Sequence, residues 1–137
     1  MAQEILVSES LTADMISAGE SLLKKLDKTD AKVSATFWLF SPEERSWKLF
    51  FSSELVKSEG PKKYYKKIVD ALKTFKEQEN TISLNDIGVT DNSDKMFLLL
   101  SNEFHTGQKI LKKRIHRETI NGYFIEDAYI YRINLHT

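Results

Sequence analysis

Histidine, carboxylate and lysine side chains are the groups in this sequence that we consider for catalysis, metal binding or anion binding. The chain contains no cysteine. The three histidines are His105, His116 and His136, and none belongs to a metal-binding pattern such as HExxH. His116 could act as a general base if a carboxylate held its ring in place. An ordinary ion pair between strands is the commoner arrangement, and we favour it. The sequence therefore predicts neither a metal site nor a catalytic histidine.

The carboxylates offer no catalytic pair either. Glu126 and Asp127 are adjacent in an alternating segment, so in a strand their side chains point to opposite faces. Asp86 and Asp91 lie near a predicted strand end and could line a pocket, although turn formation or capping is the commoner role. No nucleophile elbow, P-loop or dinucleotide-binding glycine pattern occurs. The sequence therefore contains no motif that indicates enzymatic activity, and no cofactor is predicted.

A candidate anion site lies at the start of a predicted helix, where Gly60 and Pro61 precede Lys62 and Lys63. Proline suits the first helical position, and the free amides of a helix N-terminus attract anions. Lysines there oppose the helix dipole but would favour a bound phosphate. The alternative is a solvated lysine face, which we favour because runs of like charge are usually wet surface.

The stretch KILKKRIHR, residues 109–117, concentrates cations in a chain whose formal net charge is zero. It forms one arm of the clearest predicted hairpin, which turns at Asn121–Gly122. Counting outwards from that turn gives these opposite residues: Arg117 and Glu126, His116 and Asp127, Arg114 and Tyr129, and Lys112 and Tyr131. An acidic partner opposite a cation contributes ~0.2–1 kcal/mol. The pairing thus accounts for part of the basic run.

This register predicts a face of the last hairpin on which tyrosines alternate with cations. One side of the final strand should carry Tyr123, Ile125, Asp127, Tyr129 and Tyr131. The candidate interaction surface consists of Lys112, Arg114, His116, Asp127, Tyr129 and Tyr131. Such a face can stack unpaired bases while its cations hold phosphates, and it equally suits a protein interface or a covering helix. The predicted core side carries Phe124, Ala128, Ile130, Leu111 and Ile115.

Hydrophobic periodicity predicts the elements that position these groups. Helical spacing of apolar residues predicts a helix over about 10–28 and a second one from Pro61. Two alternating segments around the loop 41–45 predict a hairpin with large apolar groups on both faces. A short strand follows at 81–89, and then a short helix that Ser93 caps and Gly107 ends. The last hairpin spans residues 109–133.

The order α-β-β-α-β-α-β-β predicts one α+β domain over residues 1–137, with a mostly antiparallel five-stranded sheet and about three helices. A length of 137 residues fits a single domain. Lys and Arg number 20 and Asp and Glu number 20, so no overall field attracts polyanions. The longest apolar run, residues 96–100, is too short to cross a bilayer. We expect a soluble cytoplasmic protein without a membrane partner.

Two stretches carry a resemblance to a known group of proteins. The sequences EGPKKYYKKI at 59–68 and INGYFIEDAYIYRI at 120–133 resemble a group of small uncharacterised bacterial α+β proteins. Members of that group share a Glu-Gly-Pro helix start and a C-terminal NG…IEDAYIYR strand. The segment MFLLLSNEFH is less similar to the group. The resemblance runs along most of the chain and supports its boundaries as one domain, but it implies no activity.

We therefore predict a small cytoplasmic protein-interaction module without enzymatic activity, with a protein partner or a second copy of the chain as its ligand. The apolar groups on both faces of the hairpin at 33–51 motivate self-association, because exposed apolar patches mark interaction sites. The second hypothesis is a single-stranded nucleic-acid-binding protein that uses the last hairpin. It ranks lower because the chain is neutral and has no RNP-type signature. An enzyme of unknown class is the third hypothesis.

Overall fold

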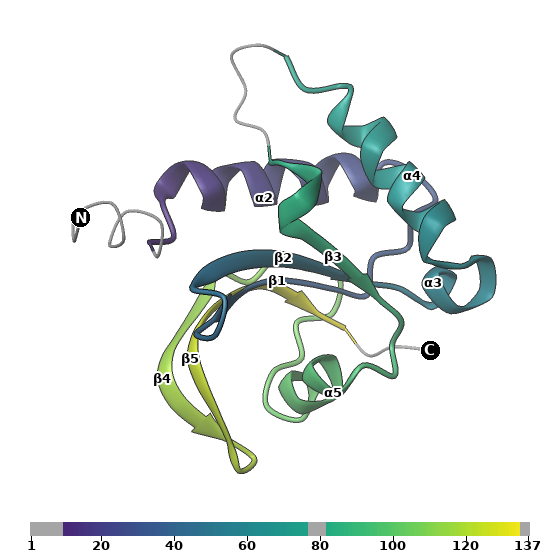
Figure 1. Ribbon diagram of the computed structural model, residues 1–137. Coiled ribbons are helices and arrows are strands. Elements are labelled where there is room, and N and C mark those ends of the chain that lie inside the picture. The colour runs from purple at the N-terminus through teal and green to yellow at the C-terminus, as the bar shows by residue number, and fades with distance from the viewer. Residues whose placement is uncertain (1–9, 77–81, 135–137) are drawn as a thin grey trace.

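A strongly curved five-stranded sheet organises the structure, a computed structural model that describes residues 10–76 and 82–134 (Figure 1). The strands are β1 (Ala35–Ser41), β2 (Ser46–Ser52), β3 (Ile87–Thr90), β4 (Lys113–Ile120) and β5 (Tyr123–Ile133). Their order in the sheet is β3-β2-β1-β5-β4. Only β2 and β3 pair in parallel, and the other neighbours are antiparallel. This confirms the predicted α+β domain with its mostly antiparallel five-stranded sheet.

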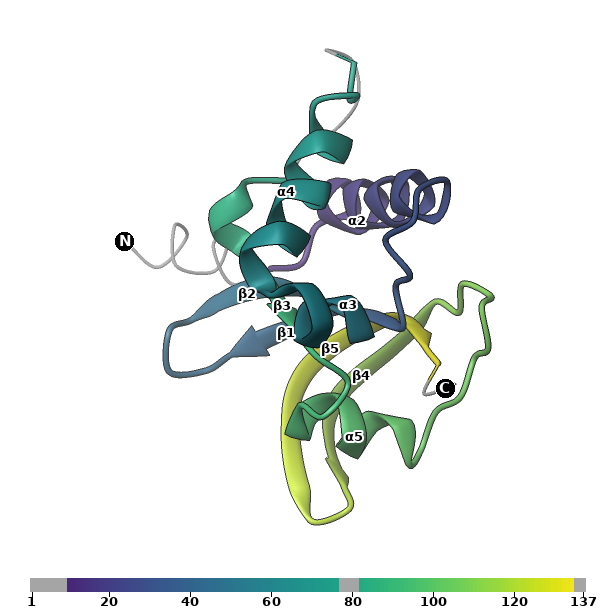
Figure 2. The ribbon, with the colours of Figure 1, turned by 90° about the vertical axis from the view of Figure 1, so that its right-hand side faces the viewer.

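The described residues form four α-helices and one turn of 3-10 helix at Leu84–Asp86. The helices are α2 (Ala13–Asp27), α3 (Glu54–Glu59), α4 (Pro61–Leu72) and α5 (Lys95–Ser101). Figures 1 and 2 show α2 and α4 on one face of the sheet, and α5 inside the curve of the other face. Helix α3 was not predicted; it has six residues, and Ser53 caps it by accepting a hydrogen bond from the Leu55 amide. None of these helices is both long and apolar enough to span a membrane.

Both faces of the sheet are covered, as the hairpin at 33–51 predicted. Under α2 and α4, Trp38 and Phe51 pack with the leucines of α2 and with Tyr64. On the other face, Phe37 and Ile130 pack with Phe97 and Leu100 of α5. Since Trp38 is buried and Phe40 is partly buried against the same core, the aromatic groups of the hairpin serve the fold. This removes the reason for expecting self-association through that hairpin.

Helix boundaries follow local capping chemistry. The Thr12 hydroxyl accepts a hydrogen bond from the Met15 amide and starts α2, close to the predicted boundary. For α5, the predicted cap Ser93 is wrong, because its hydroxyl is bound to the Asp91 carboxylate. Asp94 takes its place and accepts hydrogen bonds from two amides of the first turn. The helix ends at Ser101, well before Gly107.

The last hairpin has the predicted turn and register. Asn121 and Gly122 both have positive φ, at 49° and 83°, as a two-residue hairpin turn requires. The pairs Ile120 with Tyr123, His116 with Asp127 and Arg114 with Tyr129 all occur. The strand begins at Lys113 and not at 109, so Lys112 lies outside it and its predicted pairing with Tyr131 is absent from the ladder.

Arg117 interrupts the alternation of the hairpin faces. Its φ of 50° is left-handed, which is uncommon for a residue with a side chain. Ile115 and Ile120 are an odd number of residues apart, yet both are buried in the core beside α5. The same holds for Ile125 and Ala128 on β5. The left-handed backbone at Arg117 thus breaks the strict alternation of inward and outward side chains along the hairpin.

This break in the alternation corrects two predictions for the hairpin faces. Ile125, which we placed on the tyrosine face, is buried beside α5. Phe124, which we placed in the core, is 60% exposed near the tip of the hairpin. Leu111 is also exposed, because it precedes the first residue of β4. Simple counting from the turn gives the register correctly but assigns the wrong faces to residues between the turn and the level of Arg117.

An ion pair between a buried guanidinium and a partly exposed carboxylate joins α2 to β5. The side chain of Arg132 in β5 is 2% exposed, and its Nη1 and Nη2 donate to Asp27 Oδ1 and Oδ2 at 2.9 and 2.7 Å. Nη2 also donates to the Gln108 carbonyl at 2.6 Å, and Nη1 lies 3.4 Å from the Val33 carbonyl. One guanidinium thus holds the end of α2, the segment before β1 and the loop before β4.

Replacing Asp27 should therefore destabilise the protein strongly. Asp27→Ala leaves the Arg132 cation buried without its anion, and we expect a loss of about 3 kcal/mol in the free energy of unfolding, measured by urea denaturation. The double change Asp27→Ala with Arg132→Met removes the stranded charge and should recover part of this loss. Asp70→Ala, which breaks the exposed pair with Lys66, should cost about 0.5 kcal/mol or less. Equal losses for Asp27→Ala and Asp70→Ala would contradict the structural role of Arg132.

Gly19 marks the closest approach of α2 to the sheet. A Cβ atom at this position would lie 2.9 Å from Tyr131 Cζ and 3.0 Å from Trp38 Nε1. Gly19→Ala should therefore destabilise the protein by about 1–3 kcal/mol, although alanine favours a helix by about 1 kcal/mol. Ser17→Ala, at an exposed position of the same helix, is the control and should be neutral or slightly stabilising. A thermal or urea unfolding series in which both variants gain stability would refute the close contact.

Candidate interaction surfaces

The predicted basic and tyrosine surface is an ordered ion-pair cluster around Asp127. Arg114 Nε and Nη2 donate to the two carboxylate oxygens of Asp127, both at 2.6 Å. His116 Nδ1 lies 3.4 Å from Asp127 Oδ2. The hydrogen bonds to Asp127 raise the pKa of Arg114 above its ordinary value. The predicted neighbourhood of His116 and Asp127 is therefore present, and Arg114 is the closer partner of the carboxylate.

Further cations of the basic run also meet carboxylates. Arg117 Nε lies 3.1 Å from Glu126 Oε2, as the sequence predicts. Lys112 Nζ lies 3.1 Å from Glu20 Oε1 of α2, a partner that is remote in the sequence. Among the described residues, Lys109 and Lys113 have no carboxylate at ion-pair distance. Much of this charge is thus balanced within the fold.

Tyr131 does not belong to this surface. It is fully buried under α2, where its hydroxyl accepts from Trp38 Nε1 at 3.1 Å and donates to the Ile16 carbonyl at 2.5 Å. Burial raises its pKa above the ordinary value. The ring of the half-buried Tyr129 stands edge-on to it, with 5.3 Å between the centroids. The prediction that both rings are available to stack on bases is therefore wrong, because α2 covers this end of β5.

The candidate anion site keeps the predicted helix start. Gly60 has a φ of 93° and precedes α4, with Pro61 in the first turn. Lys62 and Lys63 are both exposed there. The anion site itself stays a prediction, as does the alternative of a solvated lysine face.

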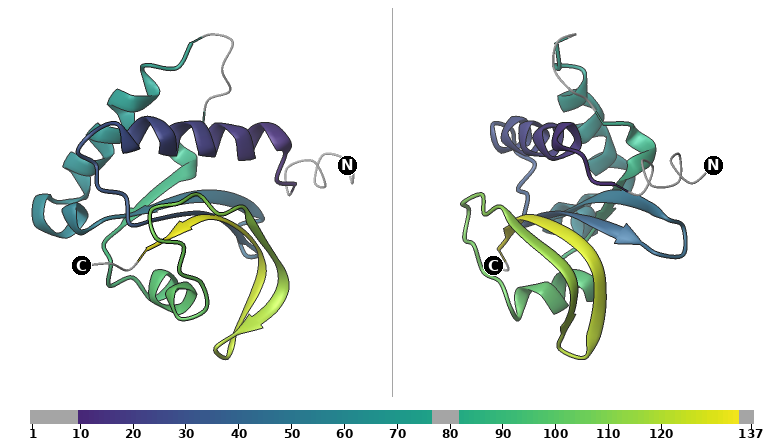
Figure 3. Two further views of the ribbon diagram at one scale, coloured as in Figure 1. Left: turned by 180° about the vertical axis from the view of Figure 1, so that it is seen from behind. Right: turned by 90° about the vertical axis from the view of Figure 1, so that its left-hand side faces the viewer.

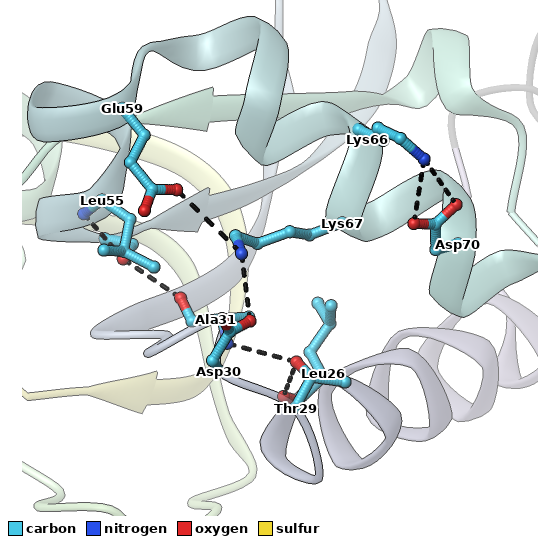
Figure 4. Close-up of polar contacts among 10 residues, drawn as sticks. Leu26, Thr29, Asp30, Ala31, Leu55, Glu59, Lys66, Lys67 and Asp70 are labelled. Atoms are coloured by element: carbon cyan, nitrogen blue, oxygen red, sulfur yellow. Dashed lines mark hydrogen bonds and ion pairs between the residues drawn. The ribbon is translucent and has the colours of Figure 1, made fainter.

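Other lysines of α4 are used within the fold (Figure 4). Lys67 Nζ lies 3.0 Å from Asp30 Oδ1 and 4.0 Å from Glu59 Oε1, so it joins α4 to the segment after α2. Its hydrogen bond lowers the pKa of Asp30. Lys66 pairs with Asp70 one turn further on, at 3.2 Å. Lys67 thus connects α4 to the segment after α2, whereas the pair of Lys66 and Asp70 lies within α4.

An apolar surface that was not predicted lies beside α5. A hollow of about 400 Å³ lies between α5 and the tip of the last hairpin. Its apolar lining comes from Met96, Leu98 and Leu99 of α5 and from Tyr123 of β5. Leu98 is 39% exposed and Tyr123 is 60% exposed. Figure 2 shows α5 enclosed by the curved hairpin, whose free tip extends past the helix.

A second hollow, of about 750 Å³, lies on the other side of Leu98. Residues of α3 and of the segment after β3 line it, among them Glu54, Lys57 and Asp91. Asp91 therefore does line a pocket, and it also forms a turn by accepting a hydrogen bond from the Ser93 amide at 2.7 Å. Hydrogen bonds from Ser93 lower the pKa of Asp91. We call the two hollows, with Leu98 between them, the α5 surface.

A signal for the α5 surface was present in the run MFLLL. Five consecutive apolar residues in a helix cover more than a full turn, so one of them must point away from the core. Phe97, Leu99 and Leu100 are buried, and Leu98 is the residue left outside.

No metal centre is evident in the part of the chain that the structure describes, where no three metal-ligating side chains come together. His105 and His116 are both exposed, and His136 lies outside the described residues. Comparisons of the chain with protein-family models, with curated proteins and with solved structures find no match. The resemblance to the small bacterial group stays a prediction, and function has to be argued from the surfaces themselves.

The ion pairs of Glu20 make a pH-dependent contribution to stability. Lys24 at 3.0 Å, and then Lys112, lower the pKa of Glu20 from its ordinary value of 4.5, against the opposing effect of burial. The charged form is thus favoured in the folded state, and its contribution is present above pH 4.5 and lost as the pH falls through the lowered pKa. We expect Glu20→Gln to cost up to about 1 kcal/mol at neutral pH and less in acid, by urea denaturation. A cost that does not change with pH would contradict this role of Glu20.

Proposed function

We propose that this protein is a protein-interaction module whose partner binds the α5 surface. The observation that carries the proposal is the position of Leu98, an exposed leucine between two hollows and beside the exposed ring of Tyr123. Leaving such groups in water is unfavourable, and their burial by a partner contributes roughly 25 cal/mol per Å² of apolar area. An exposed apolar patch with a polar rim is typical of a binding site.

The rim of the α5 surface favours a protein over a polyanion. Lys57 and Lys95 contribute positive charges, while Glu54 and Asp91 contribute negative ones. A rim of both signs around an apolar centre is typical of protein interfaces. Tyrosine is among the residues that most often dominate binding energy, which suits the position of Tyr123.

Two alternative functions have less support. Binding of single-stranded nucleic acid through the last hairpin loses its stacking platform, because Tyr131 is buried and Arg114 is held by Asp127. An enzyme that used a serine nucleophile would need a neighbouring base. Among the described residues that line the α5 surface, Ser58 and Ser93 have no histidine beside them, and the contact of Ser93 with Asp91 belongs to the turn before α5.

Affinity purification from the host tests the proposal with two matched leucine variants. Leu98→Glu places a charge at the centre of the α5 surface, and we expect it to abolish capture of the partner. Leu84→Glu is the control, since Leu84 is 41% exposed and lies outside both hollows. Both variants should unfold within about 0.5 kcal/mol of the wild type, because exposed substitutions cost little.

Sedimentation velocity on the same variants tests whether the partner is a second copy of the chain. If the chain associates with itself, the wild type and Leu84→Glu should sediment as dimers and Leu98→Glu as a monomer. A partner that binds wild type and Leu98→Glu equally would contradict the assignment of the α5 surface.

A further inference from the structure

β4 is a long edge strand whose outer side pairs with no strand of the described residues, and the left-handed Arg117 lies within it. It spans eight residues at the end of the strand order, and β5 is the strand that pairs with it. In Figures 1 and 3 the outer edge of β4 faces away from the sheet, and the helices lie over the sheet faces. The edge of a sheet presents backbone N–H and C=O groups that an incoming strand can pair with. This edge contains no proline, which would block such pairing.

In each ion pair beside this edge, the cation is more exposed to solvent than its carboxylate partner. The side chain of Arg117 is 68% exposed and that of Glu126 is 30% exposed. Arg114 and Asp127 are 44% and 12% exposed. Lys112 and Glu20 repeat the pattern at 57% and 20%. A molecule that approaches from solvent therefore meets positive charge first, although the pairs are formally neutral.

Lys113 adds a positive charge without a counterion at the start of this strand. It is exposed, and no described carboxylate lies at ion-pair distance from it. The one carboxylate of β4 itself is Glu118, five residues further along, so Lys113, Arg114 and Arg117 leave the strand with an excess of positive charge. Hydrogen bonds to Asp127 and Glu126 hold Arg114 and Arg117 in place before any ligand arrives. Ordering these long side chains in advance lowers the entropic cost of binding an anion.

We propose that the free edge of β4 takes an acidic, extended segment of a partner protein as an additional strand. Backbone hydrogen bonds along the edge would supply affinity, and the outward cations would select glutamate or aspartate side chains. This site is separate from the α5 surface and does not depend on the function proposed there. The two sites are tested by different variants.

A second copy of β4 and single-stranded nucleic acid are two other possible ligands of this edge, and both fit it less well. A second copy of β4 is a less complementary partner, because the strand carries Lys113, Arg114 and Arg117 but only one carboxylate, Glu118, and cations on edge strands normally disfavour self-pairing. Single-stranded nucleic acid would use the cations but not the backbone edge. It would also lack a stacking partner in Tyr131, which is buried.

Fluorescence anisotropy with the full-length protein and a labelled peptide of alternating glutamate and valine tests this proposal. We expect the peptide to bind, and the version with glutamine in place of glutamate to bind at least tenfold more weakly. Two further peptides carry N-methyl groups on one or the other alternating set of amides. Because only one set faces β4 in a strand pair, one methylated peptide should lose at least tenfold in affinity and the other should bind like the parent.

Charge-reversal variants locate the site on β4. Lys113→Glu should weaken peptide binding about fivefold or more. Lys63→Glu changes an equally exposed lysine on α4, and Leu98→Glu changes the α5 surface, so both should bind like the wild type.

Three results would overturn the proposal. They are absence of binding at millimolar peptide, equal affinity for the two methylated peptides, and a single-stranded oligonucleotide that binds more tightly than the peptide and displaces it. The last result would assign the edge to nucleic acid.

Discussion

The buried guanidinium of Arg132 is the constraint on which the arrangement of the elements depends. Removing a charge from water is costly, and Asp27 and two carbonyl groups offset that cost at the two Nη atoms, while the buried Nε has no hydrogen-bond partner among the described residues. Those partners come from the end of α2, the segment before β1 and the loop before β4. A shift of α2 would leave a buried charge unpaired, and a shift of either other segment would remove a hydrogen-bond acceptor from it. The ion pair thus fixes how α2 packs on the sheet.

The two candidate surfaces arise from the curvature of the last hairpin. At Arg117 the left-handed backbone lets Ile115 and Ile120 face the same core, so the hairpin wraps around α5. The inside of this curve is apolar, and α5 fills it incompletely, which leaves the hollow beside Tyr123. The far edge of the hairpin remains open as β4, with its cations outward. One local backbone conformation therefore produces an apolar site and a basic edge on the same element.

Local signals in the sequence predicted much of this fold, and contacts between distant segments explain what was missed. Asn121–Gly122 defined the turn and its register, since both depend on a few adjacent residues. The burial of Tyr131 follows from α2, more than one hundred residues earlier in the chain, and no period within the hairpin encodes it. The positive φ of Arg117 and the pairing of Lys112 with Glu20 have no local sequence signature either. For this reason the candidate surface at Asp127 was only partly predicted, and the α5 surface was missed.

The position of β5 in the sheet has a consequence for how the chain folds during synthesis. β5 lies between β1 and β4, yet it is formed by residues 123–133. Until the ribosome has released these residues, β1 has an open side, α2 lacks Tyr131 beneath it, and Asp27 has no cation. The hairpin of β1 and β2 must therefore wait with one edge of β1 unpaired, and an unpaired strand edge is prone to aggregation. Folding of this domain therefore depends on a strand that is synthesised after the other elements described, and that one central strand closes the sheet and both cores at once.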